Sequence, residues 1–341
     1  MKKAAIVIAA VVLVICAAVL ANGKKQYTYS AVGAFDTVTV ILGAQESEEE
    51  FLTNADILYR RLEWYHKLFD IYNEYDGITS LATVNRLAAE SPVEVDKEVI
   101  QMLKTAKELY SATNGQVNVA MGRVTALWKS AMDHYENTGE VLLPDDEELL
   151  QASLLCDLDK VVLDEVNNTV FFAEKGIKLD VGAVAKGYAA EMVTLFAKKK
   201  GLDSYLINVG GNVCAVGKKY NGKSWAVQVE SPREGVKTPV LMIEDASVVT
   251  SSGTKRCFGD NGEYHHIIDP DTLMPSENFL SVTVIADSSA VADGLSTALF
   301  NMGQEEAISF AEGLEGIGVV FVTKDGRVLL TREAEKYEKK N

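Results

Sequence analysis

The stretch Lys178–Tyr188 reads KLDVGAVAKGY and decides how the rest of the chain is interpreted. Its pattern predicts a strand that ends at Asp180, a tight turn of small residues, and a helix with Lys186 in its first turns. A helix N-terminus after such a turn presents free backbone N–H groups, which suit a phosphate. A lysine this early opposes the helix dipole, so it favours an anion nearby. The stretch is neither a P-loop nor a GxGxxG match, and an ordinary strand-to-helix turn explains it equally well.

Outward from this stretch, the chain alternates between predicted helices and strands. Helices are predicted over 48–68, 81–87, 96–113, 184–200 and 289–302, and another opens at Pro144. Strands are predicted over 27–29, 36–42, 159–164, 169–173, 178–181, 204–208, 212–217, 224–229, 240–244, 247–250, 264–268 and 280–285, with a last hairpin over 317–331. No repeat or Gly/Ser/Pro-rich linker separates them. We therefore expect one α+β catalytic module over residues 24–331, and a charged tail, 332–341, that frays.

Composition and charge exclude several classes of protein. The chain has 341 residues, of which 48% are hydrophobic and 24% charged, so it is globular rather than disordered. A formal net charge of −16 disfavours nucleic-acid binding but still allows a small anion held by a cation or a helix N-terminus. Cys156, Cys214 and Cys257 form no CxxC or zinc pattern and no disulfide framework.

The N-terminus, residues 1–23, has the pattern of an export signal. Two lysines precede an apolar run from Ala4 to Ala21, which is at the short limit of a membrane span. Three outcomes remain open: cleavage after Ala21, lipidation of Cys16, or retention as a single-pass anchor. We expect the anchor, with the rest of the chain on the outer face of the cytoplasmic membrane.

Three further clusters have residue types that suit chemistry. The paired glycines of NVGGNV (208–213) mark a bend or a close approach of ligand to backbone. His265 and His266 point to opposite faces if they lie in a strand, so at most one faces a site. Asp293 and Thr297 are four residues apart on a helix and would share one face, where a carboxylate and a hydroxyl suit Mg²⁺. Each cluster also has an ordinary structural explanation: a hairpin turn, a satisfied polar pair, and a Thr297 hydroxyl bonded back to its own helix.

In this order the clusters resemble the ApbE family of FAD:protein FMN transferases. The matching motifs are DVGAVAKGY (180–188), NVGGNV (208–213), WAVQVESP (225–232), VVTSSG (248–253), HHIIDP (265–270) and SVTVIADSSAVADGLSTALFNMG (281–303). The resemblance spans roughly residues 27–331 and implies a T-fold-related arrangement of mixed sheets with packed helices. One departure is Asp271-Thr272-Leu273, where the family usually has Arg-Thr-Gly, so the shape of that turn is expected to differ.

The resemblance also implies roles for individual residues. A Mg²⁺ ion would be bound by the side chains of Asp293 and Thr297 and by the carbonyl of Ala183. Asp180 and Lys186 would contact FAD, and His266 would take part in catalysis. Less sharply defined flavin contacts would come from Ser80, Met121 and Ile267.

The implied reaction transfers FMN from FAD to a serine or threonine hydroxyl of another protein and releases AMP. The implied acceptors are subunits of membrane redox complexes of the Nqr or Rnf type. Two alternatives remain: an FAD pyrophosphatase, in which water replaces the acceptor, and a non-catalytic FAD-binding lipoprotein.

Overall fold

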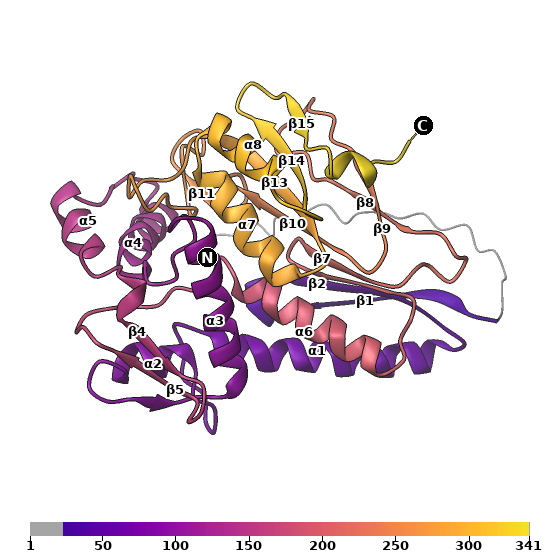
Figure 1. The fold of residues 1–341 in the computed structure, drawn as a ribbon, viewed down its shortest axis with the longest axis horizontal. Helices are drawn as coiled ribbons and strands as arrows, with labels where there is room; N and C mark the ends of the chain where they lie inside the picture. Colours follow the sequence, from indigo (N-terminus) through magenta and orange to yellow (C-terminus); the bar gives the residue numbers. More distant parts are fainter. Residues whose placement is uncertain (1–22, 341) are drawn as a thin grey trace.

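The computed structural model describes residues 23–340, and its centre is an eight-stranded antiparallel sheet (Figure 1). The strands lie in the order β1-β2-β6-β7-β10-β13-β14-β15. Their bounds are Lys25–Val32, Val38–Gln45, Tyr205–Val209, Asn212–Val216, Ser247–Ser252, Phe279–Ala286, Gly318–Thr323 and Val328–Leu330. The predicted α+β class with mixed sheets and packed helices is confirmed.

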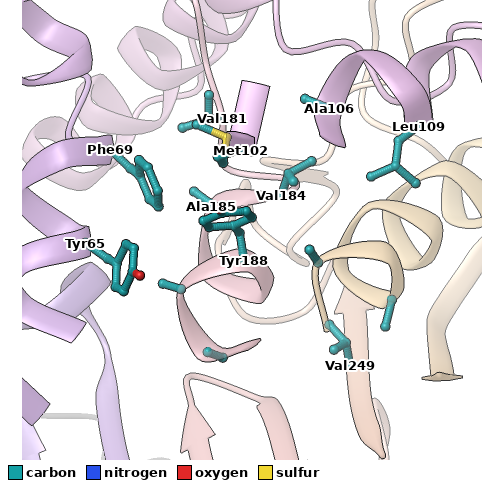
Figure 2. Packing of buried hydrophobic residues seen from close by; sticks show 14 of the residues in the cluster. Tyr65, Phe69, Met102, Ala106, Leu109, Val181, Val184, Ala185, Tyr188 and Val249 are labelled. Carbon is teal, nitrogen blue, oxygen red and sulfur yellow. The ribbon is translucent and has the colours of Figure 1, made fainter. Parts of the chain in front are cut away.

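Three long helices cover one face of this sheet: α1 (Glu48–Phe69), α6 (Ala185–Lys199) and α7 (Ser289–Asn301). The strands alternate, so Ile207 and Val284 point towards the helices while Leu206 and Ile285 point the other way. Figure 2 shows the buried aromatic centre of the helix layer, where Tyr65 and Phe69 of α1 pack on Tyr188 of α6.

The opposite face of the sheet is covered by the hairpin of β8 (Trp225–Gln228) and β9 (Val240–Ile243) and by the C-terminal residues. The expectation that 332–341 frays is wrong for most of the tail. Ala334 is fully buried, and the backbone of residues 337–339 forms hydrogen bonds with β9. The reason is a contact between residues distant in sequence. Ala334 packs directly on Gly318, and a Cβ added to Gly318 would lie only 2.8 Å from the Ala334 Cα.

A second lobe beside the sheet contains α2 (Leu81–Leu87), α3 (Lys97–Ala112), α4 (Gly122–Thr138), α5 (Asp146–Ser153) and the small sheet β3-β5-β4 (Val93–Glu94, Thr169–Phe172, Val161–Asp164) (Figure 1). The short pair β11 (Cys257–Phe258) and β12 (Tyr264–His265) packs on α4. Sequence reasoning missed α4 and also α8 (Gln304–Glu312).

Within residues 23–340, no helix has the length and apolar character needed to cross a membrane. The predicted leader falls almost wholly on residues outside that range.

Candidate functional site

The stretch Lys178–Tyr188 forms an extended segment, a turn and the start of α6, as its pattern indicates. The predicted strand over 178–181 is wrong as a regular element, because the structure has only one isolated parallel bridge, between Met121 and Lys178. The Asp180 N–H donates to the Val119 carbonyl (2.8 Å) instead of to a continuous neighbouring strand. The segment ends beside α4 because these bonds join it to the chain that precedes that helix.

Asp180 holds the turn before α6 in place. Its Oδ1 accepts from the Gly182 N–H (3.0 Å), and its Oδ2 accepts from the Thr125 hydroxyl on α4 (2.8 Å). Leu179, the residue before Asp180, is held by the Asn85 side-chain amide, which donates to the Leu179 carbonyl (3.0 Å) and accepts from the Leu179 N–H (2.7 Å). Two elements distant in sequence therefore fix the backbone on which Asp180 stands.

A recess of about 200 Å³ opens next to this carboxylate, and its lining includes Tyr72, Lys129 and Asp180. The Tyr72 side chain is 63% exposed and offers an aromatic face to a planar ligand. Desolvation and the nearby Asp180 raise the pKa of Tyr72 to about 12, so the phenol is neutral. The volume is below the usual 300–1,000 Å³ of a pocket for a drug-sized ligand, so it suits one end of a dinucleotide. A larger recess of about 330 Å³ beside Trp64 contains none of the predicted site residues.

Asp293 lies on α7 at the N-terminus of α6. Its side chain is 5% exposed, and its Oδ2 accepts from the Gly187 N–H (2.7 Å) with Lys186 Nζ at 3.7 Å. Burial raises the pKa of Asp293, although Lys186 and the Gly187 amide oppose the shift. The buried Asn212 amide also lies near this carboxylate, but its nitrogen forms no hydrogen bond of ordinary geometry within the described residues. The carboxylate therefore meets the N-terminus of α6 and a lysine at one point.

The two helices can meet here because residue 187 is glycine. A Cβ at that position would lie 2.3 Å from the Ser289 carbonyl oxygen and 2.5 Å from the Asp293 Cβ. Any larger residue would push α6 and α7 apart and lengthen the bond to Asp293.

The predicted metal ligands lie around this junction, and the residues present fit Mg²⁺. The Thr297 hydroxyl is one turn beyond Asp293 and lies 3.4 Å from the Asp293 carbonyl and 3.2 Å from the Ser251 hydroxyl. Ala183 is in the turn before α6, four residues before Gly187, whose N–H donates to Asp293. Within residues 23–340, no set of three or more His, Cys, Asp or Glu side chains could hold a metal. One carboxylate with neutral oxygens, completed by substrate phosphates, is typical of Mg²⁺ sites.

The two histidines differ as their alternation predicts. His265 is buried, and its Nδ1 accepts from the Ile267 N–H (3.2 Å), so its Nε2–H donates to the Ser276 carbonyl (2.9 Å). His266 is exposed, and its Nδ1 lies 3.3 Å from the Arg256 carbonyl, which leaves Nε2 as the proton acceptor. The protein around the ring lowers the pKa of His266 by desolvation although part of the residue is exposed, and the charges of Arg256 and Lys186 lower it further. His266 is thus within the electrostatic range of Lys186 at the N-terminus of α6.

The remaining predicted contacts are mostly buried. Ser80 is fully buried and its hydroxyl donates to the Asn73 carbonyl (2.9 Å), so it stabilises the loop that carries Tyr72. Met121 is 5% exposed at the start of α4, and Ile267 is 7% exposed next to His266. The side chains of Met121 and Ile267 therefore belong to the buried core and offer little exposed surface to a ligand.

The turn after Asp269 has a left-handed residue at its end. Leu273 has a φ of 62°, a conformation that glycine adopts without strain. Two hydrogen bonds hold Leu273 in this conformation. Its N–H donates to the Asp269 carbonyl (2.8 Å), and its carbonyl accepts from the Trp128 Nε1–H (2.8 Å). Asp271 accepts from the Gln116 amide (2.8 Å), so the acid that replaces the family's arginine is used within the fold.

Sequence reasoning missed Gly187, Asn85 and Tyr72. A glycine early in a predicted helix is unfavourable and can indicate close packing, so Gly187 carried a signal. Asn85 and Tyr72 carried none, because their roles depend on chain segments that only folding brings near them.

Comparison with known proteins agrees with this geometry. The ApbE family matches residues 35–321. A Treponema pallidum protein named FAD:protein FMN transferase is 33% identical over 267 residues, which cover 73% of this chain and 72% of that protein. A Klebsiella pneumoniae protein of the same name is 30% identical and covers 91% of this chain and 93% of its own length.

Solved structures give the same result. The crystal structure of the ApbE protein of Thermotoga maritima superimposes with a TM-score of 0.81 at 25% identity, over 93% of this chain and all of that one. The flavin transferase ApbE of Vibrio cholerae has a TM-score of 0.76 at 25% identity, over 92% of this chain and 99% of that one. The family match over residues 35–321 and the relatives at 33% and 30% identity show that this chain belongs to the ApbE family.

Proposed function

We propose that this protein transfers FMN from FAD to a serine or threonine hydroxyl of an acceptor protein in a Mg²⁺-dependent reaction that releases AMP. The observation that carries the proposal is the junction of α6 and α7. There one buried carboxylate, a lysine and a helix N-terminus meet within electrostatic range of a neutral, solvent-accessible histidine.

The proposed cation would be held by the Asp293 carboxylate, the Thr297 hydroxyl and the Ala183 carbonyl. When bound, Mg²⁺ would neutralise charge on the diphosphate oxygens. Lys186 and the amides at the start of α6 would bind the same diphosphate, since the Lys186 Nζ lies 3.7 Å from the Asp293 carboxylate and donates to the Gly182 carbonyl (3.2 Å) in the turn before α6.

The chain's own residues also position the reacting groups. Tyr72 and Asp180 line a recess for one ring system of FAD, which orients the diphosphate against α6. The acceptor hydroxyl attacks the phosphorus on the FMN side, the bond to the bridging oxygen breaks, and AMP leaves with that oxygen. His266 Nε2 takes the hydroxyl proton, since its Nδ1 is directed at the Arg256 carbonyl.

We further propose that the protein works outside the cytoplasmic membrane and modifies subunits of Nqr- or Rnf-type redox complexes. The basic and apolar pattern of residues 1–23 supports export, and the ApbE resemblance supports the class of acceptor.

The test is an intact-mass measurement of a candidate acceptor domain incubated with the purified chain, FAD and Mg²⁺, with and without EDTA. Asp293→Asn removes the charge at the junction, and Asp56→Asn is the matched control, because Asp56 is a surface acid paired with Arg60 on α1. We expect a metal-dependent gain of one FMN that Asp293→Asn abolishes and Asp56→Asn retains. AMP and FMN released without any acceptor would instead identify a pyrophosphatase. Bound, intact FAD with every acceptor unmodified would identify a carrier.

A further inference from the structure

Glu191, on α6, contacts the N-terminus of α7 one turn further along α6 than Gly187, the residue that contacts Asp293. Its Oε2 accepts from the Ser288 hydroxyl (2.5 Å) and from the Ala290 N–H (3.0 Å). Ser288 is the N-cap residue of α7, and its hydroxyl oxygen accepts from the Val291 N–H (3.2 Å). Glu191 therefore satisfies a first-turn amide of α7 and holds the residue that caps this helix.

The two helices thus cap each other. Asp293 of α7 accepts the first-turn amide of Gly187 in α6, and Glu191 of α6 accepts the first-turn amide of Ala290 in α7. Gly187 and Glu191 are four residues apart and share one face of α6. Each carboxylate lies at the positive end of the other helix's dipole, where an anion is stabilised.

This arrangement fixes how far α7 can slide or rotate against α6. The contact at Gly187 sets the distance between the helices, since a Cβ there would lie 2.3 Å from the Ser289 carbonyl oxygen. The bonds of Glu191 set the position of the first turn of α7 along α6. Asp293 and Thr297 follow on the same helix, one and two turns after Ala290, so their positions relative to Ala183 depend on that setting.

We infer that Glu191 is a positioning residue for the cation site: by capping α7 it holds Asp293 and Thr297 at the distance from Ala183 at which one cation can contact all three. The inference rests on the proposed cation site. Outer residues that orient metal ligands typically change metal affinity by about 10–100-fold when they are removed.

The test measures binding of Mn²⁺ as a probe, from the electron paramagnetic resonance signal of the free ion, with and without FAD. Glu191→Ala is expected to weaken Mn²⁺ binding by about 10–100-fold. Glu191→Gln keeps an oxygen that can accept from Ala290, so it is expected to restore the affinity to within about threefold. Glu305→Ala is the control: it removes an acid from the exposed first turn of α8 and should bind Mn²⁺ like the native chain.

A double-mutant cycle separates positioning from general destabilisation. Ser288→Ala removes the other side of the same contact, so it should weaken Mn²⁺ binding in the native background and add little in Glu191→Ala. If Glu191→Ala does not fold, Glu191→Gln and Ser288→Ala are compared by themselves, and equal, native-like affinity in both overturns the inference. Unchanged Mn²⁺ affinity in a folded Glu191→Ala, with only a lower melting temperature, also overturns it. Native Mn²⁺ binding without FMN transfer would count against the proposed function alone, whereas absence of Mn²⁺ binding by the native chain would overturn the inference.

Discussion

Gly187→Ala tests whether the close contact of α6 and α7 builds the site. The added Cβ would lie 2.3 Å from the Ser289 carbonyl oxygen, about 1.1 Å short of the 3.4 Å at which ordinary contact begins. If the helices separate by that amount, the Gly187 N–H to Asp293 distance grows from 2.7 Å to about 3.8 Å, beyond hydrogen-bond range.

The expected cost follows from two opposing effects. Overpacking of a well-packed interior costs about 1–3 kcal/mol. Replacement of glycine by alanine within a helix returns about 0.5–1 kcal/mol. The difference, about 0–2.5 kcal/mol, lowers Tm by up to roughly 4 °C, because the entropy of unfolding is about 2.1 cal/mol/K per residue in a chain of 341 residues. Because the Asp293 carboxylate, which would lose its bond to Gly187, belongs to the proposed cation site, the affinity for Mn²⁺ should fall as well.

Thermal unfolding followed by circular dichroism, together with the Mn²⁺ titration, measures both effects. Gly303→Ala is the control, because its φ is −56° and no atom lies within 4 Å of the added Cβ. Gly303 is the N-cap of α8, so alanine there costs up to roughly 1.5 kcal/mol, but that variant should keep native Mn²⁺ affinity. Native Tm and native Mn²⁺ affinity in Gly187→Ala would refute the idea that this contact sets the site.

Three further predictions concern single side chains. His266→Gln should lower the rate of FMN transfer by about 10²–10⁴-fold, while FAD affinity, measured by flavin fluorescence, stays within a few fold. Because the pKa of His266 lies below its ordinary value of 6.5, the rise of native kcat/KM on the acid side should occur below pH 6.5. Lys186→Met should weaken FAD binding about tenfold or more, and the loss should shrink at high salt. Burial opposes ionisation of Asp70, but hydrogen bonds from Tyr75 and Asn73 outweigh it and lower the pKa. The stability that Asp70 adds is therefore present above its ordinary pKa of 3.8 and is lost as the pH falls through the lower pKa of the folded state. The free energy of unfolding in urea should differ between Asp70→Asn and the native protein at pH 6, and this difference should shrink as the pH falls below about 4.

Local patterns predicted the elements whose signals lie within one segment. Helix α1 has an amphipathic stripe and an N-cap at Ser47, and it was predicted to within a residue of its C-terminal end. Helix α4 was missed because its buried side is narrow, Gly122, Val124, Trp128 and Ala131, and it packs partly on the distant pair β11–β12. The tail was misjudged for the same reason, since only the contact with Gly318 shows that Ala334 is buried.

The site divides in the same way. The i, i+4 spacing of Asp293 and Thr297 could be seen in the sequence, and so could the turn around Asp180. The bond between Gly187 and Asp293 joins residues 106 apart, and that between Asn85 and Leu179 joins residues 94 apart. The spacing of residue types along the sequence does not predict hydrogen bonds between segments so far apart. These bonds form only when the sheet has folded and α6 packs against α7.

The overall charge of −16 is compatible with an anionic substrate because the relevant fields are local. At physiological ionic strength, charges beyond about 8 Å are largely screened, so FAD at the junction is affected mainly by Lys186, the amides of α6 and Asp293. The charge of Asp293 is already shared with the Gly187 amide and Lys186, which leaves a diphosphate and one carboxylate for a divalent cation to join. A dinucleotide places both phosphates within this small region, whereas a nucleic acid extends past it over the acidic surface. The acidity that disfavours polyanions is therefore compatible with FAD as substrate, and in the proposed reaction the cation would join the diphosphate to the Asp293 carboxylate.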